Sequence, residues 1–145
     1  VILTPTEWQY EWYEAFIKLI KNERLIFCDY ETNGGKNEYS CVGGCYYTAK
    51  MVVLDYLSKI KKQSGVIILR EAYDEYVPLG VFNVRENIKE AMVRPYLEFE
   101  TLEDSLKHAG TKLQIPINEF VKKGTLLNEM LHTKQTTLDM YFKRG

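Results

Sequence analysis

Acidic side chains follow two apolar segments of this sequence, at positions where strands of an α/β sheet would end. Asp29 and Glu31 come directly after residues 25–28, and Glu71 follows residues 66–69. Residues two apart on extended backbone share one face, so Asp29 and Glu31 would point the same way. Carboxylates that converge from neighbouring strand ends could hold a divalent cation against phosphate, as a metal-dependent nuclease requires. The alternative is a set of solvated loop charges paired with nearby arginines.

A glycine pair before a predicted helix is the second place where chemistry could occur. Gly43 and Gly44 precede the aromatic residues Tyr46 and Tyr47. Glycine lets the backbone approach a ligand closely, and the free amides at a helix N-terminus attract anions such as phosphate. The tyrosine rings could stack on bases or sugars, although a tight turn ahead of the helix would give the same pattern. With the charged residues near the next predicted elements, the ligand-binding candidates are Gly43, Gly44, Tyr46, Tyr47, Arg70, Arg85 and Glu86.

The end of the chain has the spacing of a docking peptide that replication and repair proteins use to bind the sliding DNA clamp. Gln135 is followed by Leu138 at the third position and by Tyr141 and Phe142 at the sixth and seventh. In a 3₁₀ turn, residues three apart lie on one face, so these side chains would form a compact apolar plug. The glutamine amide can fix the entry of the peptide by hydrogen bonds. A frayed last helix folded back on the core is the alternative.

The elements that would position these residues begin with a predicted helix. Residues 4–7, Thr-Pro-Thr-Glu, combine an N-cap threonine, proline at the first helical position and glutamate three residues on. Trp8, Trp12 and Phe16 then recur at helical spacing and give one wide apolar stripe. The sequence therefore predicts a helix at the start of the chain.

The middle of the chain predicts a crossover unit. Residues 25–28 form an apolar strand, followed by a turn at 33–35, a return strand over 38–42, a helix opened by Gly43-Gly44 and a second apolar strand over 66–69. Two all-apolar strands joined through a helix normally pair in parallel, with helices covering the sheet. We therefore expect a small, mainly parallel sheet.

Helices dominate the predictions for the rest of the chain. An extended stretch over 79–82 leads into a helix from Asn83, a further helix starts at Thr101, and two short helices are separated at Gly124. The connection around Pro78 is expected to bring four charged residues to one edge of the sheet: Arg70, Glu71, Arg85 and Glu86.

Composition is that of an ordinary globular domain. Of the 145 residues, 46% are hydrophobic and 27% charged, and the formal net charge of -1 argues against a surface that coats nucleic acid. No apolar run has the length of a membrane span, so we expect a cytoplasmic protein. The chain begins with Val1, and we expect it to be the C-terminal piece of a longer protein. Its three cysteines predict reduced thiols, and their spacing is not a recognised zinc pattern.

Several segments of the sequence carry a resemblance to a known family. They are residues 43–47 (Gly-Gly-Cys-Tyr-Tyr), 68–71 (Ile-Leu-Arg-Glu), 78–86 (Pro-Leu-Gly-Val-Phe-Asn-Val-Arg-Glu) and the terminal peptide. From about Arg24 to its end the chain resembles the C-terminal region of the archaeal Nre family. Members of that family are DNA-repair factors with a clamp-binding peptide at the C-terminus. The resemblance implies repair and clamp binding, and it implies no particular reaction.

The sequence thus predicts an α/β domain over residues 1–131, with a helical C-terminal part, and a flexible tail over 132–145. We expect a DNA repair protein recruited to the sliding clamp (PCNA), with DNA as a further binding partner and no membrane contact. One alternative is a metal-dependent nuclease that uses Asp29, Glu31 and Glu71, and another is a non-catalytic adaptor between the clamp and a repair protein. No metal-binding pattern and no particular cofactor follow from the sequence.

Overall fold

A four-stranded sheet forms the centre of the protein, seen here in a computed structural model that describes residues 1–20, 23–73 and 80–133. The strands are β1 (Ile2–Thr4), β2 (Gln9–Ile20), β3 (Glu23–Thr32) and β4 (Gly65–Tyr73), in the spatial order β1-β4-β2-β3. β2 runs parallel to β4, whereas the β2–β3 and β1–β4 pairs are antiparallel. The sheet is therefore mixed, and the prediction of a mainly parallel sheet is wrong.

The first long element is β2 and not the predicted helix. Trp8, Trp12 and Phe16 are four residues apart, and a spacing of four satisfies the two-residue period of a strand as well as it approximates a helical turn. Tyr13 and Ala15, which alternate with them, are fully buried on the opposite face of the sheet. β2 is thus a central strand buried on both faces, and such strands give no alternation of polar and apolar residues.

β3 and β4 contain the predicted strand segments, but they are not neighbours. β2 lies between them because it forms a hairpin with β3 and the parallel pair with β4. The predicted turn at 33–35 is confirmed by the hydrogen bond from the amide of Gly35 to the carbonyl of Thr32, 2.9 Å. The predicted return strand over 38–42 is absent, because side chains satisfy its amides: Ser40 donates to the Tyr47 hydroxyl and Cys41 to Asp29.

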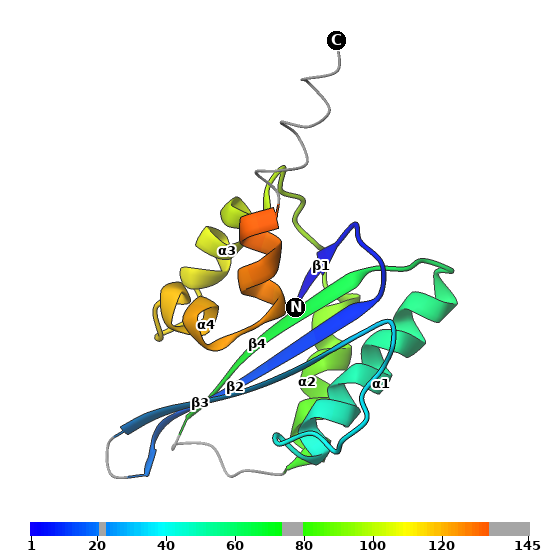
Figure 1. The fold of residues 1–145 in the computed structure, drawn as a ribbon. Helices are drawn as coiled ribbons and strands as arrows, with labels where there is room; N and C mark the ends of the chain where they lie inside the picture. Colours follow the sequence, from blue (N-terminus) through cyan, green and yellow to red (C-terminus); the bar gives the residue numbers. More distant parts are fainter. Residues whose placement is uncertain (21–22, 74–79, 134–145) are drawn as a thin grey trace.

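Helices cover both faces of the sheet (Figure 1). One face carries α1 (Gly44–Lys59) and α2 (Val81–Val93), and the other carries α3 (Leu102–Gly110), α4 (Ile117–Lys123) and the helical residues 126–133. The predicted helix starts at Gly44 and Thr101 are confirmed, and Thr101 caps α3 by accepting the amide of Asp104. The predicted strand over 79–82 is contradicted where the structure describes it, since α2 begins at Val81 after the N-cap Gly80, whose φ is 55°.

Two apolar clusters hold these layers together. Tyr10, Trp12 and Val66 pack against α1 and α2, and Tyr13, Ile67 and Phe120 pack among the helices of the other face. Burial of side chains of this size is the main stabilising contribution in a domain such as this. No helix within the described ranges has the length and hydrophobicity that crossing a membrane would require.

Candidate functional site

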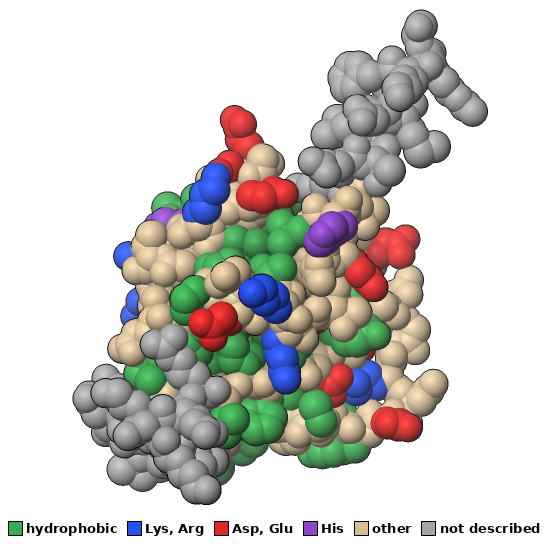
Figure 2. Space-filling model, turned by 60° about the vertical axis from the view of Figure 1, so that its left-hand side comes forward, with side chains coloured by type: hydrophobic (Ala, Val, Ile, Leu, Met, Phe, Trp, Pro, Cys, Tyr) green, Lys and Arg blue, Asp and Glu red, His purple; other side chains and the backbone are tan. Residues whose placement is uncertain are grey.

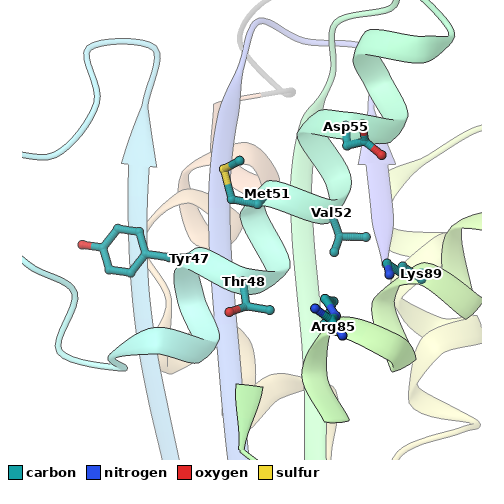
Figure 3. A pocket seen from close by; sticks show the side chains of 7 residues that line it. All are labelled: Tyr47, Thr48, Met51, Val52, Asp55, Arg85 and Lys89. Atoms are coloured by element: carbon teal, nitrogen blue, oxygen red, sulfur yellow. The ribbon is translucent and has the colours of Figure 1, made fainter. Parts of the chain in front are cut away.

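A groove between α1 and α2 is the cavity in which candidate residues from the sequence meet (Figure 3). It has a volume of about 370 Å³. Side chains from successive turns of each helix line it: Tyr47, Thr48, Met51, Val52 and Asp55 from α1, and Arg85 and Lys89 from α2. Positions 47, 51 and 55, positions 48, 52 and 55, and positions 85 and 89 are three or four residues apart, which places them on one face of each helix.

The groove combines apolar surface with charges of both signs, since Asp55 lines it on α1 and Arg85 and Lys89 line it on α2. Met51 is 63% exposed, and Phe82, at the start of α2, is also 63% exposed. The guanidinium of Arg85 lies 5.2 Å from the centre of the Phe82 ring, within the range of a cation–π contact. Arg85 and Lys89 both contact Glu86, at 2.9 and 3.3 Å, so one carboxylate is shared between two cations.

The two candidate tyrosines have different roles. Tyr47 lines the groove, but Figure 3 shows its ring directed away from Arg85, and its hydroxyl accepts the amide of Ser40 at 2.9 Å. Tyr46 is fully buried, and its hydroxyl donates to Glu31 at 3.2 Å. Burial, followed by the nearby charge of Glu31, raises the pKa of Tyr46 well above the usual value. Tyr46 is therefore a core residue and offers no ring face to a base.

The glycine pair has structural reasons of its own. Gly43 is the N-cap of α1 with φ 76° and ψ -150°, a conformation that is close to exclusive to glycine. A Cβ on Gly44 would lie 3.1 Å from Cγ1 of Val81, so this glycine lets the start of α1 approach the start of α2. Neither α1 nor α2 has a side-chain cap or an acidic residue in its first turn.

Asp29 and Glu31 share the α1 face of β3, as predicted, but each is engaged in the fold. Asp29 accepts from Lys36 at 2.6 Å and from the amides of Tyr30 and Cys41. Burial alone would raise the pKa of Asp29, but these hydrogen bonds outweigh it and lower the pKa. Glu31 is buried and contacts three groups: Lys50 at 2.6 Å, the Tyr46 hydroxyl and the indole N–H of Trp8.

Glu71 lies on the other face of the sheet, away from Asp29 and Glu31. Its carboxylate accepts the amides of Gln114 and Ile115, at 3.0 and 2.7 Å, and the hydroxyl of Tyr73. It therefore ties the connection between α3 and α4 to β4. The three carboxylates proposed for a nuclease do not converge on one site. Among the described residues, no group of three His, Cys, Asp or Glu could hold a metal ion.

Arg70 and Arg85 are also separated in their contacts. Arg70 pairs with Glu14 of β2, and both side chains are mostly buried, with 17% and 8% of their surface exposed. Burial raises the pKa of Glu14, although Arg70 opposes the shift. Arg85 pairs with Glu86 on the surface of α2. Arg70, Glu71, Arg85 and Glu86, expected together at one sheet edge, form no single ion-pair cluster, because Arg70 and Glu71 bond to partners on opposite faces of the sheet.

Glu11 is a key residue that sequence reasoning missed. It is fully buried in β2 and accepts the amides of Thr125, Leu126 and Leu127 at 2.6 to 3.0 Å. The hydroxyl of Tyr13 donates to the same carboxylate at 2.7 Å. Glu11 therefore caps the N-terminus of helix 126–133, the last described element, where a negative charge is favourable. A charged residue inside an apolar run is the one signal that could have pointed to it.

Comparison with known proteins places this mixed α/β domain in a family. The sequence model described as "Archaeal Nre, C-terminal" matches residues 31–141. The chain therefore belongs to the archaeal Nre family.

Relatives with curated names share this region. The chain is 34% identical over 131 residues to DNA repair protein NreB of Archaeoglobus fulgidus, covering 87% of this chain and 34% of that protein. It is 31% identical over 118 residues to DNA repair protein NreA of the same organism, with 79% and 30% covered. NreA of Haloferax volcanii is 25% identical over 134 residues, with 87% and 32% covered. The chain thus spans about a third of these relatives. No solved structure matches it.

Proposed function

We propose that this chain acts in DNA repair and is recruited to the sliding clamp by its terminal peptide. The observation that carries the proposal is the spacing of Gln135, Leu138, Tyr141 and Phe142 in a chain of the Nre family. These four residues lie outside the described part of the structure. Peptides of this kind bind by setting a few apolar side chains into a pocket of the partner.

The last described helix supports this proposal because it gives the terminal peptide a fixed origin. Helix 126–133 is held at its N-terminus by Glu11, and Leu126 and Leu127 are buried. His132 and Thr133 at its other end are exposed. A chain that leaves the domain at this point starts from the surface and not from the core.

Titration against the clamp by calorimetry tests the proposal. The double substitution Tyr141→Ala, Phe142→Ala should weaken binding by at least about 2 kcal/mol, the usual scale for truncated anchor residues. Lys143→Ala, which lies beside the peptide but outside its spacing pattern, is the matched control and should change little. Equal affinities of the wild-type and doubly substituted chains would contradict clamp recruitment through this peptide.

A second function, contact with DNA, is favoured by the groove between α1 and α2. Arg85 and Lys89 stand one helical turn apart beside apolar surface, and cations so spaced can contact neighbouring phosphates. Replacing both with alanine should weaken binding to single-stranded and branched DNA and should reduce the salt dependence of binding, with a slope change of about two. Lys107→Ala on α3 is the control. Unchanged binding would leave the adaptor function, with no DNA contact at this groove.

The nuclease alternative has little support from the positions of its carboxylates. Asp29 and Glu31 bond to cations and donors on the α1 face, whereas Glu71 bonds to backbone amides on the other face. Incubation of the protein with branched and single-stranded DNA, in magnesium or manganese, should leave the DNA intact. Cleavage that survives purification and is abolished by Glu31→Gln, in a variant that remains folded, would restore the nuclease function.

A further inference from the structure

The connection between α2 and α3, residues 94–100, exposes several apolar side chains, although Phe99 also contacts the ring of His108. It joins the two helical layers around the sheet and appears as the yellow-green coil between α2 and α3 in Figure 1. Tyr96 is 78% exposed, Leu97 is 65% exposed and Phe99 is 40% exposed, and Val93, at the end of α2, is 79% exposed. These exposed apolar residues follow one another closely in the sequence, and exposed apolar surface of this kind commonly marks an interaction site.

The backbone of this connection has few partners within the described part of the chain. Residues 95–99 contain no helix, turn or bend, and the preceding Arg94 has extended angles, φ -69° and ψ 151°. None of the amides from Tyr96 to Glu100 makes a hydrogen bond with another described residue. Backbone amides that have no partner among the described residues can pair with an extended segment of a partner protein.

Negative charge accompanies the exposed apolar residues. Glu98 and Glu100 lie within the connection and Glu103 follows it on the first turn of α3, and none of the three forms an ion pair with a described residue. Arg94, the nearest cation in the sequence, is already paired with Glu90. The connection is therefore an acidic and apolar strip.

We propose that residues 94–100 form a docking strand for an extended, basic segment of a partner protein. The partner would pair its backbone with Tyr96 to Glu100, place lysine or arginine side chains beside Glu98 and Glu100, and cover Tyr96 and Leu97 with apolar side chains. This surface uses none of the residues that line the groove between α1 and α2. A second copy of the chain fits it poorly, because like carboxylates would face each other across the pair.

The proposal can be tested with a displayed library of random peptides. The peptides are about ten residues long, which is the upper length of ordinary strands. Peptides are selected on the whole chain and counter-selected on a Tyr96→Ser, Leu97→Ser variant. The expected sequences alternate apolar residues with lysine or arginine. A synthetic peptide of the selected sequence should protect the amides of Tyr96 to Glu100 from hydrogen exchange, which is the signature of backbone pairing and not of loose charge attraction.

Charge reversal separates this docking strand from a general sticky surface. Glu98→Lys with Glu100→Lys should weaken the selected peptide at least roughly tenfold, since like charges then meet. The matched control is Glu38→Lys, which reverses another exposed carboxylate outside the connection and should leave binding unchanged. Selection of no sequence above the counter-selected background would overturn the proposal, as would selection of acidic sequences. Sedimentation that shows a dimer lost in the Tyr96→Ser, Leu97→Ser variant would instead identify a second copy as the occupant.

Discussion

Glu11 shows how a single side chain can join two parts of this fold. It leaves the central strand β2 and accepts three successive amides at the start of helix 126–133. The nearby Tyr13 donates to the same carboxylate, and Gly124 leaves room for the phenol. A Cβ on Gly124 would lie 1.6 Å from the Tyr13 oxygen and 3.0 Å from Oε2 of Glu11. The hydrogen bond between Tyr13 and Glu11 therefore requires a glycine at position 124.

Gly124→Ala is expected to destabilise the domain strongly. Overpacking a well-packed core costs about 1–3 kcal/mol, and the upper part of that range applies because Tyr13 is fully buried and held by Glu11. Urea unfolding measures the loss. Gly34→Ala is the matched control, since a Cβ there would meet only Thr32 at an ordinary 3.8 Å. Equal unfolding midpoints for the two variants would show that the contact among Gly124, Tyr13 and Glu11 is loose.

Buried tyrosines give the domain a dependence on alkaline pH. Burial is the largest cause that raises the pKa of Tyr10, Tyr13 and Tyr46, and nearby groups such as Glu11 beside Tyr13 raise it further. In the unfolded chain these phenols ionise near the usual pKa of about 10, whereas in the folded protein they stay protonated. The folded state then holds more protons, so stability is full below about pH 10 and falls as the pH rises above it.

Tyr13→Phe should make this alkaline loss of stability less steep. Each retained proton contributes up to about 1.4 kcal/mol per pH unit, so the difference between the variants grows with pH. Urea midpoints measured at about pH 9 and about pH 11 give the slope. Tyr39→Phe is the control, because Tyr39 is 73% exposed and should leave the slope unchanged. A slope that Tyr13→Phe does not alter would show that Tyr13 ionises in the folded protein.

At the scale of the elements, some local signals predict the structure correctly, whereas the partnerships between strands do not follow from the sequence. The helix starts at Gly44 and Thr101 depend on glycine and threonine at the cap, and the structure has both. The parallel partner of β4 is β2, for which the sequence predicts a helix. A spacing of four between Trp8, Trp12 and Phe16 fits both the helical period of 3.6 and the strand period of 2. Because β2 is buried on both faces, its sequence lacks the alternation of polar and apolar residues that would indicate a strand.

The candidate site could be predicted only in part for a related reason. Residue types indicated Arg85 and Tyr47, and both line the groove, but their neighbour Lys89 depends on how α2 packs on α1. Asp29 and Glu31 were placed on one face by their spacing alone. Glu71 follows Arg70 directly, so on a strand it had to point to the opposite face, and its partners Gln114 and Ile115 are too distant in sequence to infer.

Glu71→Gln tests whether this carboxylate is structural. The substitution replaces one acceptor oxygen by a donor that faces two backbone amides, and leaving such groups unsatisfied costs about 1–3 kcal/mol. We expect faster hydrogen exchange at the amides of Gln114 and Ile115 and a lower unfolding midpoint. Glu86→Gln on the exposed surface of α2 should change neither quantity. Unchanged exchange in Glu71→Gln would mean that the connection between α3 and α4 is held elsewhere.

At the scale of the whole molecule, one sheet separates two layers that carry different surfaces. The α1 and α2 layer carries the groove with Arg85 and Lys89, and the other layer ends in helix 126–133. On the side turned forward in Figure 2, acidic and basic side chains are mixed, with hydrophobic side chains between them. Such a surface suits several specific contacts better than it suits a general coat on nucleic acid. The face shown in Figure 2 therefore gives no support for a surface that coats nucleic acid.

Such a domain should be separable from its terminal peptide. The last described element is helix 126–133, and its buried residues Leu126 and Leu127 belong to the core. Both remain in a chain that ends at residue 133. Removal of residues 134–145 should therefore leave the melting temperature unchanged, and a synthetic peptide of these residues should bind the clamp as tightly as the whole chain. Ordering a flexible peptide offsets part of its gain, so we expect an affinity in the micromolar range, roughly -8 kcal/mol. Calorimetry measures the affinity of the peptide for the clamp, and thermal unfolding measures the melting temperature of the truncated chain. A lower melting temperature of the truncated chain would mean that Tyr141 and Phe142 pack on the core, and a much weaker peptide would mean that the domain itself contacts the clamp.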